Sequence, residues 1–244
     1  MTAASRDAMV FAAGLGTRLG ELGRDTPKAL IDVGGRTMLE HALRRLAAAG
    51  ADRIVVNVHH HAERIAEFLA AHDWGAEVLV SREPGAPLET GGGLWHAHAL
   101  FRGDRTILLH NVDVVLDADL GAFAAAHEAS GALVTLAVNA RDTARTLLFD
   151  DAGLVGRDDR RRPDARTLAR PPHGEPRAWA FAGIHACAPR LLALITERGA
   201  FPIVDLYLRL AATGERIAAW PTTAQWLEIG SAERLAAARA ALGH

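Results

Sequence analysis

The sequence predicts an α/β protein with a mainly parallel, Rossmann-like twisted sheet flanked by helices. Short apolar runs alternate with amphipathic helical stretches through the first 139 residues, and this alternation is typical of βαβ units with parallel strands. The apolar run 8–13 leads directly into a glycine-rich turn, as a buried first strand of such a sheet does. With 244 residues and 50% hydrophobic side chains, the chain is long enough to bury one large core.

The first half of the chain alternates strands and helices in a regular order. Thr37 and Glu40 have the spacing of a capping box, and the apolar periodicity that starts at Met38 ends at Gly50. We expect strands at 8–13, 53–58, 77–81, 106–111 and 133–139, and helices at 38–49, 61–71, 92–100 and 120–129. Right-handed crossovers then place the loops that follow the strands along one edge of the sheet, where ligands of such sheets bind.

The pattern changes after Asn139, and a small C-terminal α/β region is expected there. Residues 147–155 predict a hairpin. The segment Arg157–Pro176 is rich in Arg, Asp and Pro and predicts an exposed loop, either a solvated excursion or a mobile flap over a substrate. The remaining predictions are strands at 179–186 and 226–229, a short segment at 216–220, and helices at 189–198, 203–212 and 232–242. No linker is long enough to separate two domains, so residues 1–244 are expected to form one.

Composition and charge exclude several classes of protein. The formal net charge is -2, so no general basic field would hold a nucleic acid backbone. The single cysteine, Cys187, leaves no internal disulfide and suits a reducing compartment. Residues 1–7 lack the apolar core of a signal peptide, and no apolar run reaches membrane-spanning length. We therefore expect a cytoplasmic protein with no nucleic acid and no membrane partner.

A glycine-rich loop with two cations follows the first predicted strand. The two glycines in residues 12–19 let the backbone turn and point N–H groups at phosphate oxygens. The loop lacks the Gly-Lys-Ser/Thr ending of a Walker A motif, and Leu19 replaces the third glycine of a dinucleotide fingerprint. Arg18 adds a bidentate cation, and the turn Thr26-Pro27-Lys28 adds a lysine beside the same strand edge. These groups indicate a site for a polyphosphate such as an NTP.

The same residues resemble the signature of the sugar-phosphate nucleotidyltransferases. The signature reads Ala12-Ala13-Gly14-Leu15-Gly16-Thr17-Arg18-Leu19, then Pro27-Lys28 and Val33-Gly34-Gly35. The resemblance covers nearly the whole chain and implies an enzyme that joins an NTP to a sugar 1-phosphate and releases pyrophosphate. It implies a nucleotide-binding part at 1–139 and a sugar-phosphate-binding part at 140–244. It assigns the nucleotide to Ala12, Ala13, Gly14, Gly16, Thr17, Arg18 and Lys28, with Arg18 and Lys28 also catalytic.

A second glycine cluster occurs in Pro87-Leu88-Glu89-Thr90-Gly91-Gly92-Gly93, before a predicted helix. Its glycines indicate either a close packing contact or the approach of a nucleobase or sugar to a helix N-terminus. The resemblance places this loop beside the nucleotide and adds Glu89 and Gly92 to the binding residues. The loop at the end of the strand 53–58 is expected to place Asn57 or His59 near the nucleotide as well. The amino-acid sequence of this loop is similar to that of the N-acetylmuramate-1-phosphate uridylyltransferases, which implies UTP as the preferred nucleotide.

Two carboxylates are the expected ligands of a catalytic Mg²⁺. Asp113 follows the strand 106–111, where the family has Gly-Asp and this chain has Val112 before the Asp. The second family ligand lies in Trp-x-Asp-x-Gly, and Glu228 takes its place in Trp226-Leu227-Glu228-Ile229-Gly230. The extra methylene of glutamate changes its reach by roughly 1.5 Å. These departures leave open a nucleotide-binding regulatory protein with impaired catalysis.

The acceptor side of the reaction is expected in the C-terminal part. Phe181-Ala182-Gly183-Ile184-His185 resembles the family strand that carries a glycine under the sugar. Asn139 ends a strand in the same region, and of the nearby cations Arg141 and Arg145, the second is favoured for the sugar phosphate. A guanylyl- or cytidylyltransferase acting on another phosphorylated sugar or alcohol is the alternative enzyme, and the protein is expected to be a monomer or a small homo-oligomer.

Overall fold

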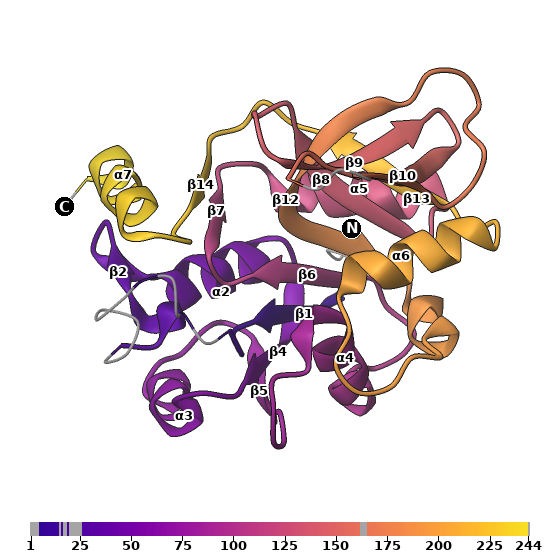
Figure 1. The fold of residues 1–244 in the computed structure, drawn as a ribbon. Coiled ribbons are helices and arrows are strands. Elements are labelled where there is room, and N and C mark those ends of the chain that lie inside the picture. Colours follow the sequence, from indigo (N-terminus) through magenta and orange to yellow (C-terminus); the bar gives the residue numbers. More distant parts are fainter. Residues whose placement is uncertain (1–4, 15, 17–18, 20–25, 162–164, 244) are drawn as a thin grey trace.

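The computed structural model describes residues 5–14, 16, 19, 26–161 and 165–243, and these form a layered α/β fold (Figure 1). The strands are β1 (Arg6–Phe11), β2 (Asp32–Val33), β3 (Arg36–Thr37), β4 (Ala51–Val58), β5 (Glu77–Arg82), β6 (Ile107–Asn111), β7 (Val114–Leu116), β8 (Val134–Asn139), β9 (Arg145–Asp150), β10 (Gly153–Asp159), β11 (Arg166–Leu168), β12 (Arg177–Cys187), β13 (Ile217–Pro221) and β14 (Trp226–Glu228). The α-helices are α2 (Met38–Ala48), α3 (Ala62–Ala70), α4 (Glu89–His96), α5 (Leu120–Ser130), α6 (Ile203–Ala212) and α7 (Ala232–Leu242). Short 3₁₀ turns are η2 (Lys28–Leu30), η3 (His98–Leu100) and η4 (Pro189–Leu194).

The main sheet has the strand order β11-β10-β9-β12-β6-β1-β4-β5, with β8 on β12 and β13 on β8. Strands β6, β1, β4 and β5 are parallel to one another, so the predicted α/β fold class is confirmed. The long strand β12 runs antiparallel to both β6 and β8, which gives β6 and β8 the same direction. The carboxyl ends of β1, β4, β6 and β8 therefore share one edge of the sheet, and the candidate site lies there.

Helices cover both faces of the sheet and bury two apolar clusters. One cluster packs α2, α3, α5 and α7 on the sheet, with fully buried side chains such as Leu43 and Phe123. The other packs α4 and α6 on the opposite face, around Tyr207 and Leu109. The predicted cap is present, because the Glu40 N–H donates to Thr37 Oγ1 at 3.1 Å. Within the described residues, no helix combines the length and apolar character needed to span a bilayer.

The prediction of an exposed loop at Arg157–Pro176 is wrong for two stretches, 157–159 and 166–168, which are strands. Strand β10 continues to Asp159, and β11 pairs with it from Arg166 to Leu168. This ribbon is anchored by Asp150, whose side chain is 1% exposed and accepts a 2.8 Å hydrogen bond from Arg170 Nη1. Arg170 holds the pKa of the Asp150 carboxyl well below its usual range. Arg170, one of the polar residues whose abundance predicts a loop, thus forms a buried ion pair that holds the strands in place.

The predicted helix at 189–198 is also wrong in its second half, because only Pro189–Leu194 is helical, as a 3₁₀ turn. Arg209 from α6 donates to the Leu194 carbonyl at 2.9 Å and to Glu197 Oε1 at 2.5 Å. The first of these tertiary bonds uses a backbone acceptor, the Leu194 carbonyl, that a continuing helix would need.

The final helix α7 closes the structure beside β2, at the opposite end of the sequence (Figure 1). Arg239 Nε donates to the Asp32 carbonyl at 3.1 Å, and Leu242 approaches Gly34 so closely that a Cβ there would lie 3.0 Å from it.

Candidate active site

The first glycine loop leaves β1 at the shared edge of the sheet. The Ala12 N–H donates to Asn57 Oδ1 at 2.8 Å, which fixes the start of the loop to the end of β4. Gly16 has φ +66°, a conformation in which glycine is strongly favoured, and a Cβ at Gly14 would meet nothing within 4 Å. Of the predicted phosphate-binding residues, Thr17 and Arg18 lie outside the described residues. The described part of the loop presents an open, uncrowded backbone.

A cavity of about 300 Å³ opens beside this loop. Six of its lining residues were predicted from the sequence, namely Ala13, Gly14, Lys28, Asn57, Glu89 and Asp113. The others are Phe11, Glu83, Pro87, Thr90, Asn111 and Val112. The cavity thus joins the glycine loop, the predicted lysine and the predicted metal-binding carboxylate into one site.

Glu83 is a buried carboxylate of this cavity that sequence reasoning missed. It is 7% exposed, and Asn57 beside it is 2% exposed. Glu83 Oε1 accepts from Asn57 Nδ2 at 2.5 Å, and Oε2 accepts from the Leu88 N–H at 2.8 Å. Because Asn57 also accepts from Ala12, one chain of hydrogen bonds joins the two glycine loops. The sequence signal that could have identified it is a carboxylate directly after a strand and before a proline.

The second glycine cluster makes close packing contacts at all three positions. A Cβ at Gly91 would lie 2.3 Å from the Phe201 ring, and one at Gly92 would lie 2.2 Å from the Gly199 carbonyl oxygen. A Cβ at Gly93 would lie 2.6 Å from Asn57 Nδ2. The N–H groups of Gly91 and Gly92 donate to the Phe201 carbonyl at 2.9 and 3.3 Å. These two amides are therefore engaged within the protein, and the role of Gly92 in nucleotide binding stays a prediction.

Glu89 is held in an unusual backbone conformation at the rim of the same cavity. Its φ is +59°, the left-handed region that a residue with a Cβ adopts rarely. Strain of this kind costs about 1–3 kcal/mol and is commonly found at ligand sites.

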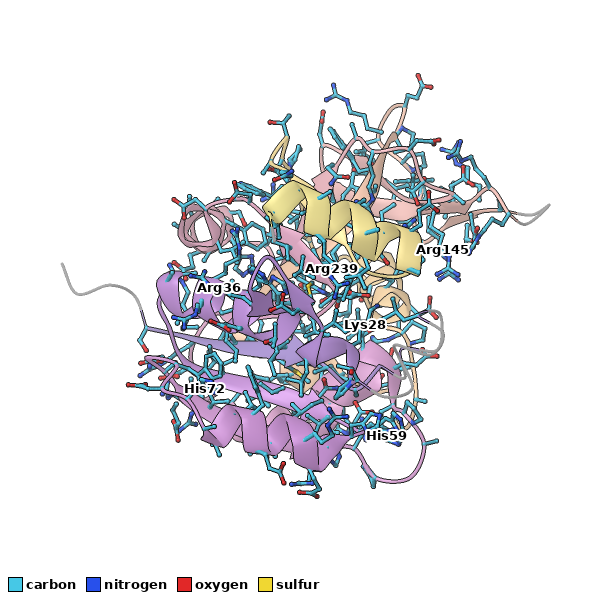
Figure 2. The ribbon with its side chains drawn as sticks, turned by 90° about the vertical axis from the view of Figure 1, so that its left-hand side faces the viewer. Lys28, Arg36, His59, His72, Arg145 and Arg239 are labelled. Carbon is cyan, nitrogen blue, oxygen red and sulfur yellow. The ribbon has the colours of Figure 1, made fainter. Side chains whose placement is uncertain are left out.

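Lys28 and Asp113 form an ion pair in the lining of the cavity. Lys28 Nζ lies 2.5 Å from Asp113 Oδ2, and the two side chains are 12% and 22% exposed. Lys28 begins the turn η2, and Asp113 follows β6 after Val112, whose N–H donates to the Phe11 carbonyl. The valine in place of the family glycine is thus accommodated as a buried residue. Figure 2 shows Lys28 in the middle of this face of the molecule.

Glu228 is brought next to Asp113 by a short pair of strands. Glu228 pairs with Val114 in the antiparallel ladder of β14 and β7, and the Ile229 N–H donates to the Asp113 carbonyl at 3.0 Å. The Glu228 carboxylate forms an ion pair with Arg234. A Cβ at Gly230 would lie 2.4 Å from Glu228 Oε1, so the glycine of this motif leaves room for the longer acid.

Two carboxylates on neighbouring backbone segments suit a divalent cation only if other ligands complete its shell. No group of three or more His, Cys, Asp or Glu side chains converges as a metal site in the part of the chain that the structure describes. Mg²⁺ is usually held by only one or two carboxylates together with waters and substrate phosphates. Asp113 and Glu228 lie on adjacent backbone segments beside a loop suited to phosphate, and their role as metal ligands stays a prediction.

A second cavity of about 670 Å³ lies farther along the same edge of the sheet. It is lined by Asn139, Ala140, Arg141, Trp179, Trp220, Pro221, Thr222, Thr223, Ala224 and Trp226. The Arg141 guanidinium stacks 3.8 Å from the centre of the Trp226 ring and donates to Asn139 Oδ1 at 2.8 Å. Asn139 is thus placed in this cavity as a wall residue.

The two cavities are separated by the bulged middle of β12. Gly183 has φ +81°, and a Cβ on it would lie 3.1 Å from Asn111 Nδ2 in the wall of the first cavity. Asn111 Oδ1 is buried without a hydrogen-bond partner among the described residues. The carbonyl groups of Phe181 and Ala182 accept from Arg141 and Trp226, respectively, in the wall of the second.

Arg145, the cation favoured for the sugar phosphate, lies apart from both cavities. Its side chain is 72% exposed, and its Nε is 3.3 Å from Asp159 Oδ2. Figure 2 shows it above and to the right of Lys28, toward the right-hand side of the molecule. Its role in acceptor binding stays a prediction.

Comparison with protein families decides the class of this site. The family model described as "Nucleotidyl transferase" matches residues 7–243. The chain therefore belongs to the nucleotidyl transferase family. Nucleotidyl transferase activity, predicted from the sequence, is thereby confirmed as the enzyme class.

Individual relatives of this nucleotidyl transferase extend the match over the full chain. The chain is 35% identical to N-acetylmuramate alpha-1-phosphate uridylyltransferase from Caulobacter vibrioides, covering 99% of both chains. It is 30% identical to the enzyme of the same name from Neisseria meningitidis serogroup B, over 97% of this chain and 98% of that one. Its fold matches a putative glucose-1-phosphate thymidylyltransferase from Bacillus anthracis with TM-score 0.82 and 17% identity, covering 98% and 95% of the two chains.

Proposed function

We propose that this chain transfers a uridylyl group from UTP to N-acetylmuramate α-1-phosphate, giving the UDP-sugar and pyrophosphate. The observation that carries nucleotidyl transfer is the ion pair of Lys28 Nζ and Asp113 Oδ2, 2.5 Å apart, in the lining of a cavity beside the glycine loop. The choice of nucleotide and sugar rests on the two full-length relatives called N-acetylmuramate alpha-1-phosphate uridylyltransferase. It also rests on the amino-acid sequence of the loop at 87–93.

The acceptor supplies its own nucleophile in this reaction. A sugar 1-phosphate has a second pKa of about 6, so at neutral pH it is mostly a dianion. One of its oxygens attacks the α-phosphorus of the NTP, the bond from that phosphorus to the bridging oxygen breaks, and pyrophosphate leaves with the electron pair. No protein base has to remove a proton. The protein contributes by positioning and by neutralising charge.

The protein's own residues divide that work. The backbone of the first glycine loop binds the triphosphate, with Thr17 and Arg18 assigned to it by the sequence. Lys28 supplies a cation beside the reacting phosphate, and Glu83 with Asn57 holds the two loops at a fixed separation. We further propose that Asp113 and Glu228 hold a Mg²⁺ ion, which would neutralise charge on the α-phosphate during transfer.

The acceptor sugar is proposed to occupy the second cavity. All the lining residues of the first cavity lie before position 114, and all those of the second lie after position 138. Apart from Asn139, which lines the second cavity, this division supports a nucleotide-binding part at 1–139 and a sugar-phosphate-binding part at 140–244. Asn139 and Gly183 lie at or near the second cavity, and its three tryptophans offer flat apolar surfaces on which a sugar ring packs.

A panel of four NTPs against several sugar 1-phosphates, read as pyrophosphate release, tests this function. Turnover only with UTP and N-acetylmuramate α-1-phosphate supports the proposal. Preferred turnover with GTP or CTP, or with another phosphorylated sugar, would replace it by the alternative enzyme. A thermal shift with NTPs but no release from any pair would instead identify a binding protein.

A further inference from the structure

Arg141 is a half-buried cation in the wall of the second cavity that the proposed chemistry does not use. Its Nη1 donates to Asn139 Oδ1 at 2.8 Å and its Nη2 to the Phe181 carbonyl at 2.6 Å. The central carbon of its guanidinium lies over the Trp226 ring, 3.8 Å from the ring centre. A guanidinium has five N–H donors, so these two bonds leave donors available at the cavity.

No carboxylate forms an ion pair with Arg141 anywhere among the described residues, and Glu228 acts on it only through its charge. Burial lowers the pKa of the Arg141 guanidinium, and Glu228 raises it only in part. Charges removed from water are costly unless they are paired. By contrast, the exposed Arg145 four residues later does have an acidic neighbour, Asp159. A partly desolvated arginine without a counter-ion, in a cavity wall, indicates a site that receives an anion from a ligand.

The anion that Arg141 would bind is a different group from the reacting phosphate, because Arg141 lies farther along the site. Trp226, which contacts Arg141, and Glu228 are two residues apart on β14 and so lie on the same face of that strand. Glu228 in turn lies beside Asp113, where the reacting phosphates are proposed to bind. An acceptor whose phosphate lies near Asp113 therefore extends along this face toward Arg141.

From this arrangement we infer that Arg141 binds a carboxylate carried by the acceptor sugar, and so selects sugar 1-phosphates that bear a second anionic group. The inference rests on the proposed function and deepens it. Muramate carries a lactyl ether on its ring, and the carboxylate of that ether is such a group. Arginine suits it because the planar fork donates two parallel hydrogen bonds to a carboxylate.

Two other roles for Arg141 predict different behaviour. If Arg141 only supported Trp226 and β14, its loss would impair every acceptor to the same degree. If it bound the phosphate common to all acceptors, the loss would again be uniform. Only recognition of the carboxylate makes the loss depend on whether the acceptor carries that group.

The test is a cycle of two enzymes and two acceptors. Arg141→Gln and the unaltered protein are each assayed with UTP and either N-acetylmuramate α-1-phosphate or N-acetylglucosamine α-1-phosphate, the same sugar without the lactyl ether. For the muramate acceptor, kcat/KM should fall about 100-fold in the variant. For the other acceptor the fall should be at least about tenfold smaller, so that the preference for the carboxylate collapses.

A matched control is Arg198→Gln, since the Arg198 guanidinium also stacks on a tryptophan, at 4.0 Å from Trp95, and lines neither cavity. Equal losses with both acceptors in Arg141→Gln would overturn the inference and leave the proposed function standing. If the unaltered protein used neither acceptor with UTP, the proposed function itself would fail. Circular dichroism of each variant shows whether the fold is retained.

Discussion

Replacing Glu83 by glutamine exchanges one carboxylate oxygen for an NH₂ in the hydrogen-bond chain between the two glycine loops. Both ends of this chain are backbone donors, the Leu88 N–H and the Ala12 N–H. Between them, Glu83 accepts twice, and Asn57 donates to Glu83 and accepts from Ala12. With glutamine at position 83, each orientation of the two amides leaves one donor facing another donor.

The size of the effect follows from that unsatisfied donor. A buried N–H without an acceptor costs about 1–3 kcal/mol, and losing a charge-assisted bond adds about 1 kcal/mol. We expect Glu83→Gln to lower the free energy of unfolding by about 2–4 kcal/mol, although the side chain keeps its volume. For a chain of this length that corresponds to a fall in Tm of roughly 4–16 °C.

A second substitution should restore the complete set of hydrogen bonds that Glu83→Gln disrupts. When Glu83→Gln is combined with Asn57→Asp, the new glutamine accepts from Leu88 and donates to the new carboxylate at position 57. That carboxylate also accepts from Ala12, so every donor again has an acceptor. Asn57→Asp alone places two carboxylates at the 2.5 Å contact now made by the amide, and it should be destabilised at neutral pH by like charge. Urea unfolding of the four proteins gives the coupling energy. Additive losses in the double variant, or a Glu83→Gln protein as stable as the parent, would refute the reasoning.

Three further outcomes are expected. Lys28→Ala and Asp113→Ala should each cut turnover by orders of magnitude while circular dichroism stays the same, and near-normal turnover in both would overturn the assigned roles. Glu228→Asp should keep activity, whereas Glu228→Ala should lose activity or its dependence on Mg²⁺; an unchanged Mg²⁺ titration would remove Glu228 as a ligand. Burial lowers the pKa of His110 to about 4 and that of His185 to about 3, so the unfolded chain binds their protons first and stability is lost as the pH falls from about 6.5 toward about 4. At pH 5 each of the two histidines should lower the free energy of unfolding by about 2 kcal/mol relative to pH 7. Equal urea midpoints at the two pH values would contradict this.

Elements with local signals were predicted well from the sequence. The helix at 232–242 is found with the same bounds, and the one at 38–49 ends one residue earlier. Caps at Ser231 and Thr37 explain this, because the start of each helix is encoded by neighbouring residues. The direction of β12 was not predicted, since periodicity of side chains carries no information about which neighbour a strand pairs with.

Site residues that depend on distant contacts were the ones missed or ranked differently. Glu83 gains its role from Asn57 on the neighbouring strand β4 and from Leu88 beyond it, a combination that only the register of β4 and β5 creates. Arg141 and Arg145 look equivalent in sequence. They differ because Arg141 meets Trp226, 85 residues later, while Arg145 points toward solvent.

The central claim is that the site around Lys28 and Asp113 moves a nucleotidyl group from UTP to a sugar phosphate. The most direct test uses UTP radiolabelled in its α-phosphate, incubated with N-acetylmuramate α-1-phosphate and Mg²⁺. We predict that the label appears in the UDP-sugar with one pyrophosphate released per product, and that Asp113→Asn abolishes this transfer. Label that remains in UTP, or that appears as free UMP or UDP, would contradict the account.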